Sequence, residues 1–264
     1  MADDGIRTRV RLHVIHDLGG GSAKWLQDFV RADAGCENLV LRSFTHDDNA
    51  GGGVALYASA FDEEPLRAWT FEEKIPAVAV SHAAYRAALE DVLATRGVDA
   101  IFVSSLIGHS LDALDTALPT VVVTHDYFPY CPAINLYFDG RCERCDGARL
   151  AQCAAENERF NPFVGFPPGD RARVRSRYLD LVRRPNVVMA VPSRSVADNL
   201  VRLDDAFRDA AFVEIPHGYA DPPRPLEVDP PAAGDRLRVV VLGQLSVAKG
   251  VEILQQAEIG RAHV

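Results

Sequence analysis

The chain has 264 residues, 48% of them hydrophobic, and a formal net charge of −9 at pH 7. This length can supply one large core or two unequal ones, and the negative charge argues against a general nucleic-acid-binding protein. No apolar run approaches the ~20 residues of a transmembrane helix, and the N-terminus lacks the apolar stretch of a secretory signal. We therefore expect a cytoplasmic protein with mostly reduced cysteines.

Strand-like and helical segments alternate along most of the chain. Apolar runs predict buried strands over residues 9–16, 38–44, 54–61, 100–104, 120–124, 187–191 and 211–215. Helical spacing predicts helices after Ser22, over 78–95, around 111–118, over 171–184 and after Ser193, with a glycine-rich turn at 51–53. This alternation indicates an α/β fold with a Rossmann-like, doubly wound parallel sheet and helices on both faces.

The first predicted strand runs directly into the glycine-rich segment HDLGGGSAK and then into a helix. Gly19, Gly20 and Gly21 allow a ligand to approach the backbone closely, and the helix N-terminus favours an anion such as a phosphate. The spacing excludes a Walker loop, and Lys24 stands in the place of the third glycine of a dinucleotide fingerprint. We therefore predict contact with a ligand but not NAD binding.

A second candidate site follows the strand predicted over 120–124. That apolar strand delivers His125 and Asp126 at its carboxyl end, where open α/β sheets bind their ligands. A histidine there can hydrogen-bond a sugar hydroxyl or exchange a proton near neutral pH, and an adjacent aspartate can fix its tautomer. The alternative is a histidine that only caps the strand end in the crevice wall.

Between residues 127 and 170 the alternation pauses in a segment rich in cysteine, proline, glycine and aromatic residues. Cys131, Cys142, Cys145 and Cys153 fall close together there, and one pair has the C-x-x-C spacing of a metal knuckle. Four thiolates in such an insertion could bind one structural Zn²⁺ tetrahedrally. The alternatives are packed free thiols or a pair that is sensitive to oxidation.

The helix predicted over 171–184, RARVRSRYLDLVRR, is rich in arginine. It could make peripheral contact with anionic lipid headgroups at the inner face of a membrane, or with a phosphorylated acceptor. The alternative is a solvated helix face that balances the acidic remainder of the chain.

Residues 218–235 are rich in proline and are predicted to link two domains. Residues 236–258 then contain the apolar run RVVVLG, Lys249 and a helical pattern after Gly250, an arrangement that suits a diphosphate. We read them as the first βα unit of a second, truncated domain. The last residues, IGRAHV at 259–264, resemble a translated sequencing adapter, so we expect a non-native tail on a fragment of a longer gene.

The ordered set of motifs resembles a bacterial glycosyltransferase of the GT-B fold, family 4. It consists of the strand–GGG–helix unit, THDYFPYCPAINL, VVMAVPSRSVADNL, EIPHG and VVVLGQLSVAKG, and it covers about residues 9–257. The resemblance implies an acceptor-side N-terminal domain over 1–217 and a C-terminal domain that binds a nucleotide sugar. It also implies that the paired glutamates that grip the donor lie beyond Val264, so we expect the chain by itself to be inactive.

The resemblance also implies roles for single residues. Gly20 and Gly21 match the glycine pair that approaches the donor phosphates, and His125 matches the histidine that contacts the transferred sugar. Lys249 matches the lysine that neutralises the leaving diphosphate. The chain departs from the family in having Gln244 in place of an arginine, which supplies hydrogen bonds without charge, and Ala23 in place of a frequent glutamate.

The implied activity is retaining transfer of a sugar from a nucleotide-sugar donor to a cell-surface polysaccharide or glycolipid. In such a front-face transfer the leaving diphosphate accepts the proton of the acceptor, and no metal is obligatory. Two alternatives stay open. One is a nucleotide-sugar epimerase of the same fold, and the other is a non-catalytic module that binds nucleotides or carbohydrates.

Overall fold

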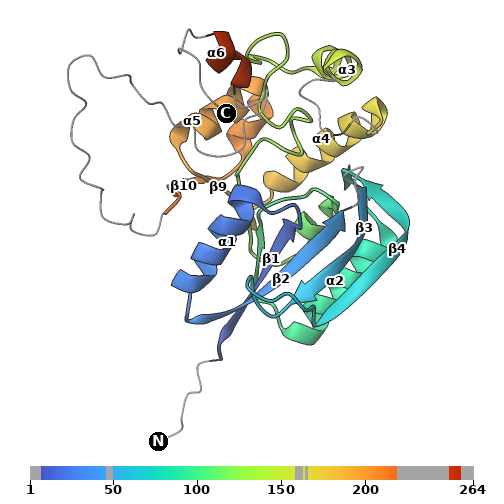
Figure 1. The fold of residues 1–264 in the computed structure, drawn as a ribbon, viewed down its shortest axis with the longest axis vertical. Coiled ribbons are helices and arrows are strands. Elements are labelled where there is room, and N and C mark those ends of the chain that lie inside the picture. Colours follow the sequence, from blue (N-terminus) through green and yellow to red (C-terminus); the bar gives the residue numbers. More distant parts are fainter. Residues whose placement is uncertain (1–6, 46–49, 158–162, 164–165, 219–249, 257–264) are drawn as a thin grey trace, which may run out of the picture. The chain divides into compact units, whose positions relative to one another are not determined.

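The computed structural model describes residues 7–45, 50–157, 163, 166–218 and 250–256 (Figure 1). The chain divides into two compact units, Met1–Gly218 and Tyr219–Val264. In the described part of the chain, no helix has the length and apolar character needed to cross a membrane.

The first unit is built on an eight-stranded sheet with the order β10-β9-β8-β6-β1-β2-β3-β4. The strands are β1 (Arg9–His16), β2 (Cys36–Thr45), β3 (Ala50–Tyr57), β4 (Arg67–Pro76), β6 (Ala100–Val103), β8 (Thr120–Val123), β9 (Val187–Val191) and β10 (Phe212–Glu214). Neighbouring strands from β10 to β2 are parallel, whereas β3 and β4 are antiparallel additions. The α/β class and the mostly parallel sheet are therefore confirmed.

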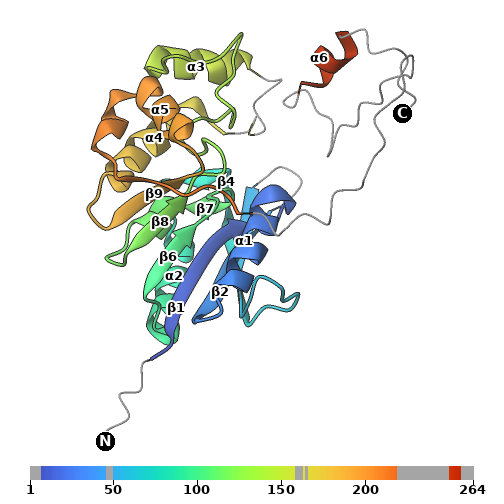
Figure 2. The ribbon, with the colours of Figure 1, turned by 90° about the vertical axis from the view of Figure 1, so that its left-hand side faces the viewer.

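Helices cover both faces of this sheet (Figure 2). The first unit contains α1 (Gly20–Ala32), α2 (Ala83–Arg96), α3 (Gly147–Glu156), α4 (Pro168–Val182) and α5 (Arg194–Leu203). Successive β1 side chains point to opposite faces. Val14 therefore joins the large core cluster that includes α2 and α4, while Ile15 joins a small cluster with Leu26 of α1 and Val40. The α1 face thus has only a thin apolar layer.

Two of the predicted helices differ from the structure. The helix predicted over 78–95 begins only at Ala83, because Val78–Ala79 forms β5, which pairs with β7 (His109–Ser110). Its end is as predicted, since Gly97 takes the left-handed conformation with φ 59°. The helix expected around 111–118 is a short 3₁₀ turn, Leu111–Leu114.

The sequence predicts a turn at the glycine-rich segment 51–53. In the structure this segment is instead part of β3. A Cβ at Gly53 would overlap the Phe44 ring and the Trp69 carbonyl oxygen, and one at Gly51 would overlap the Gly108 backbone. These glycines therefore serve close strand packing. The β4 strand next to it was not predicted, because most of its residues are exposed and its sequence has no long apolar run.

The second unit is described at Gly250 and in helix α6 (Val251–Gln256). The helical pattern predicted after Gly250 is confirmed for these six residues. The strand predicted before it, Gln244, Lys249, the linker after Gly218 and the tail at 259–264 lie outside the described residues.

Replacing Gly53 tests the packing role of the β3 glycines. Gly53→Ala is expected to lower the free energy of unfolding by about 1–3 kcal/mol, because the new methyl group must displace Phe44 or the β4 backbone. Gly35→Ala is the matched control, since a Cβ there meets no atom within 4 Å. Urea denaturation of both variants measures the difference, and equal stabilities would contradict the packing role.

Candidate functional site

The carboxyl ends of the parallel strands meet at one edge of the sheet, and the candidate residues lie there. β1 is followed by the glycine loop, and β8 is followed by Thr124, His125 and Asp126. β1 also lies between β2 and β6, so the winding of the chain reverses at this strand. Open α/β sheets bind ligands in the crevice at such a switch point. The structure therefore brings the two predicted sites to the same edge.

The glycine loop begins α1 without a side-chain cap. Gly19 and Gly20 have φ of 71° and 79°, a conformation that favours glycine. A Cβ added at Gly19, Gly20 or Gly21 would meet no atom within 4 Å, so the space in front of the loop is open. Ser22, the expected N-cap, lies inside the helix, and the N-cap is Gly19. The first N–H groups of this 13-residue helix have no side-chain cap and can bind an anion.

His125 forms an aromatic cluster with two residues from distant parts of the chain. Its ring contacts Trp25 of α1 edge-on, with centroids 5.0 Å apart, and stacks on His217 at 5.2 Å. Burial, together with the nearby His217 and His16, lowers the pKa of His125 to about 4. Its Nε2 atom is buried and has no hydrogen-bond partner among the described residues. His125 is therefore uncharged at neutral pH, and its Nε2 atom has no partner among the described residues.

His217 and Trp25 are site residues that the sequence analysis did not assign. His217 follows β10 in the motif EIPHG, so its place after a parallel strand was the available signal. Trp25 lies in the helix predicted after Ser22, and its spacing gave no signal of a role at the site. Their contact with His125 depends on how α1, β8 and β10 are placed in the sheet.

Asp126 and His125 point to different surroundings. The Asp126 Oδ1 atom accepts a hydrogen bond from the Phe128 N–H at 2.8 Å, and no described hydrogen bond joins it to His125. The predicted control of the His125 tautomer by Asp126 is therefore not seen in the described contacts. Asp126 instead lines a cavity of about 20 Å³ with Ser104 and Thr124, which is large enough for one water molecule. Burial raises the Asp126 pKa to about 6.

A larger cavity, which we call the α1 groove, runs beside α1 from the glycine loop. Its volume is about 340 Å³, and it is lined by Gly19 and Ala23, by Arg42 and Tyr57 of the sheet, and by the segment 60–63 after β3. Ala23, near the start of α1, is thus part of its wall. The volume lies at the lower end of the range typical of small-molecule sites.

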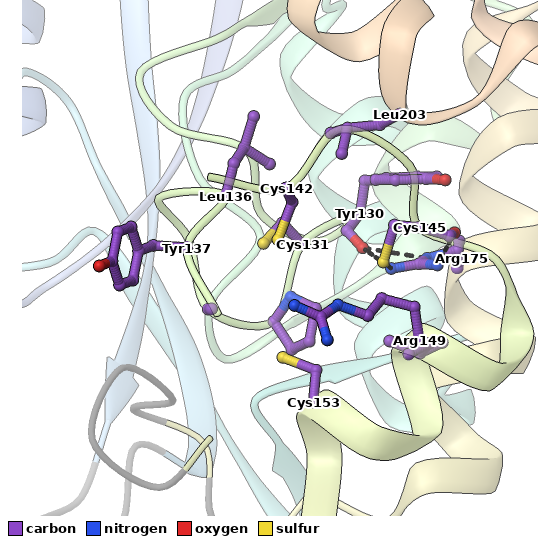
Figure 3. Close-up of a pocket in the computed structure, with 13 residues that line it drawn as sticks. Tyr130, Cys131, Leu136, Tyr137, Cys142, Cys145, Arg149, Cys153, Arg175 and Leu203 are labelled. Carbon is purple, nitrogen blue, oxygen red and sulfur yellow. Dashed lines mark hydrogen bonds between the residues drawn. The ribbon is translucent and has the colours of Figure 1, made fainter. Parts of the chain in front are cut away.

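The four clustered cysteines surround one small cavity (Figure 3). Cys131, Cys142 and Cys153 are buried, Cys145 is half-buried, and all are free thiols. The cavity has a volume of about 10 Å³. Burial raises the pKa of Cys131 to about 12, so that thiol stays protonated in the metal-free protein. Within the described residues, no three His, Cys, Asp or Glu side chains are placed to share a metal ion. The zinc site therefore stays a prediction.

The arginine-rich helix, α4, holds this cysteine segment from inside the protein. Arg175 is buried, stacks on Tyr130 at 4.2 Å, and donates to the carbonyl oxygens of Tyr130 and Cys145. Its Nη2 atom also lies 3.2 Å from the Cys145 sulfur. Arg171 is likewise buried and donates to the carbonyl oxygens of Phe163 and Phe166. Two basic groups of the predicted surface helix are thus internal donors.

The other arginines of this stretch have acidic partners. Arg177 and Arg184 both pair with Asp115, Arg183 pairs with Asp180, and Arg173 pairs with Asp170. The pairing favours the alternative of a charge-balanced helix. It leaves the predicted contact with a membrane without support from free positive charge on α4.

Models of known protein families, curated proteins and solved structures were each compared with the chain, and none of them matches it.

Arg175 is expected to be a strong determinant of stability. Arg175→Met should lower the free energy of unfolding by about 2–4 kcal/mol, because it leaves the Tyr130 and Cys145 carbonyl groups without their donor. Arg173→Ala, on the exposed side of the same helix, should change it by less than about 0.5 kcal/mol. Thermal and urea unfolding of both variants measure the contrast. If both variants lost a similar amount of unfolding free energy, the structural role of Arg175 would be contradicted.

Asp126 should make stability depend on pH between about 4 and 6. Its folded pKa of about 6 lies above the usual aspartate pKa of 3.8, so its ionisation opposes folding as the pH rises through this interval. Asp126→Asn keeps an acceptor for Phe128 and cannot ionise. We expect it to gain about 1–3 kcal/mol over the parent at pH 7.5 and almost nothing at pH 4.

Urea denaturation at the two pH values measures this effect. Asp146→Asn is the matched control, because Asp146 also accepts a backbone N–H, from Arg149 at 2.8 Å, but is exposed. A gain at pH 7.5 that is as large for Asp146→Asn as for Asp126→Asn would show that burial of Asp126 is not its cause.

Proposed function

We propose that the chain is the acceptor-side part of a retaining, nucleotide-sugar-dependent glycosyltransferase of the GT-B type. The observation that carries the proposal is the placement of a neutral histidine, His125, at the same sheet edge as the uncapped N-terminus of α1. One element suits a phosphate and the other suits a hydroxyl group. A nucleotide sugar contains both groups next to the bond that is broken.

The donor diphosphate would accept hydrogen bonds from the N–H groups at Gly20 and Gly21. The half-buried His125 ring would contact a hydroxyl of the transferred sugar. A neutral imidazole suits this role because it donates through one nitrogen and accepts through the other, as does a hydroxyl. Asp126, which holds the Phe128 N–H, would act by positioning the loop after β8.

The chemistry requires no resident metal. As the bond from the sugar to the diphosphate breaks, the acceptor hydroxyl attacks from the same face and its proton passes to the leaving diphosphate oxygen. Gln244 and Lys249 would add hydrogen bonds and one positive charge to that leaving group. The donor is a cytoplasmic metabolite, so we propose that the reaction takes place in the cytoplasm.

His125 should matter far more for turnover than for stability. In the protein expressed from its whole native gene, His125→Ala is expected to lower turnover of a nucleotide sugar by ~10²–10³-fold, as loss of one transition-state contact does. His125→Gln keeps an amide that can face the sugar hydroxyl and should recover part of the loss. Release of free nucleotide with a glycan acceptor present measures turnover, and unfolding midpoints show that the variants are folded.

The products distinguish the alternatives. Transfer to the acceptor, abolished by His125→Ala, supports a glycosyltransferase. Interconversion of the donor sugar in the absence of any acceptor would instead indicate an epimerase. Donor binding with neither product would indicate a binding module. Full activity of His125→Ala would remove this residue from the site.

A further inference from the structure

The α1 groove has a distinctive charge pattern. Asp17, two residues before Gly19 in the chain, lines the groove together with Asp62 and Glu63 from the segment after β3. Arg42 is the one lysine or arginine among the described residues that line the groove. Three carboxylates therefore share a cavity of about 340 Å³ with a single guanidinium group.

The guanidinium of Arg42 is committed to the protein itself. Its Nη1 atom donates to the Asp62 carbonyl oxygen at 3.1 Å, and its Nη2 atom donates to the Ala60 carbonyl oxygen at 2.9 Å. Its flat face also stacks over the Tyr57 ring at 4.2 Å. Arg42 thus uses two of its five N–H donors to shape the wall of the groove.

Aromatic surface accompanies the carboxylates. Phe61, which lines the groove, is 43% exposed, and the Arg31 guanidinium, which pairs with Asp28, lies 4.6 Å from its ring centroid. Gln27 of α1 adds an amide that can both donate and accept. Carboxylates accept hydrogen bonds from vicinal hydroxyl groups, and an aromatic ring packs against the C–H face of a sugar ring. This combination suits a carbohydrate, and the negative charge disfavours an anionic one.

We infer that the α1 groove is the acceptor site and that it selects non-anionic sugars, uncharged or amino, over phosphorylated or carboxylated ones. The assignment as acceptor site rests on the proposed function, because Gly19 lines the groove and belongs to the loop proposed to bind the donor phosphates. The charge selection rests only on the residues that line the groove.

The test is direct binding of monosaccharides to this chain, with no donor present. The probes are methyl glucoside, glucosamine, glucuronate and glucose 6-phosphate, and saturation-transfer NMR at low salt measures their dissociation constants. We expect methyl glucoside and glucosamine to bind at least ~tenfold more tightly than the two anionic sugars. The dissociation constants of glucosamine and methyl glucoside show whether the groove prefers amino sugars or uncharged sugars.

Three variants connect the selection to the groove. Glu63→Gln should weaken glucosamine and reduce the discrimination against glucuronate, and Phe61→Ala should weaken all the sugars. Glu64→Gln is the matched control, since Glu64 is exposed and does not line the groove. Anionic sugars that bind as tightly as methyl glucoside, an unchanged order in Glu63→Gln, or no binding by any probe would each overturn the inference.

Failure of this inference is distinguishable from failure of the proposed function. If the groove binds non-anionic sugars but the protein from the whole gene transfers none, only the glycosyltransferase proposal fails. If that protein transfers sugar preferentially to phosphorylated or carboxylated acceptors, only the selection inferred for the groove fails.

Discussion

The candidate site depends on the pairing of β1 with parallel strands on both of its edges. β2 extends the sheet from one edge of β1, and β6 extends it from the other edge. The connections that follow neighbouring strands therefore run to opposite sides, which leaves a crevice at the carboxyl end of β1. Gly19 and Gly20 then turn the chain from β1 into α1 through positive φ angles. One strand thus positions the open helix N-terminus, the start of the α1 groove and the edge that carries His125.

Burial influences the charges at this edge, because it favours the neutral form of both an acid and a base. It lowers the pKa of His125 and raises that of Asp126, because in both cases the charged form loses its hydration. Near pH 7 His125 is therefore uncharged, whereas Asp126, with a pKa of about 6, still carries most of its negative charge. The α1 groove, in contrast, is open and is lined by three carboxylates. Under the proposed function, the backbone N–H groups at the start of α1 would bind the donor phosphate. The carboxylates of the α1 groove would bind sugar hydroxyl groups.

The cysteine segment shows why a charged helix need not face solvent. Much of residues 124–146 lies outside helices and strands, so many of its carbonyl groups depend on donors from elsewhere. Arg175 supplies three hydrogen bonds to two of these carbonyl groups, and Arg171 supplies two to residues 163 and 166. The sequence analysis could identify α4 from its spacing, but its composition resembled an exposed face. Which arginines turn inward depends on carbonyl groups that are distant in the sequence.

Local patterns by themselves determined β1 and β9 to the residue, and the end of α2 at Gly97, because side-chain alternation and left-handed glycine act within a few residues. They also located Gly19–Gly21 and His125 after strands, so the parallel-sheet rule brought both to one edge. Only the tertiary structure decided that 51–53 is strand, since Gly53 is needed by the Phe44 ring packed against it. The tertiary structure alone decided that His125 stacks on His217, because local periodicity does not show which distant segments meet. It also decided that Asp126 binds the Phe128 N–H group.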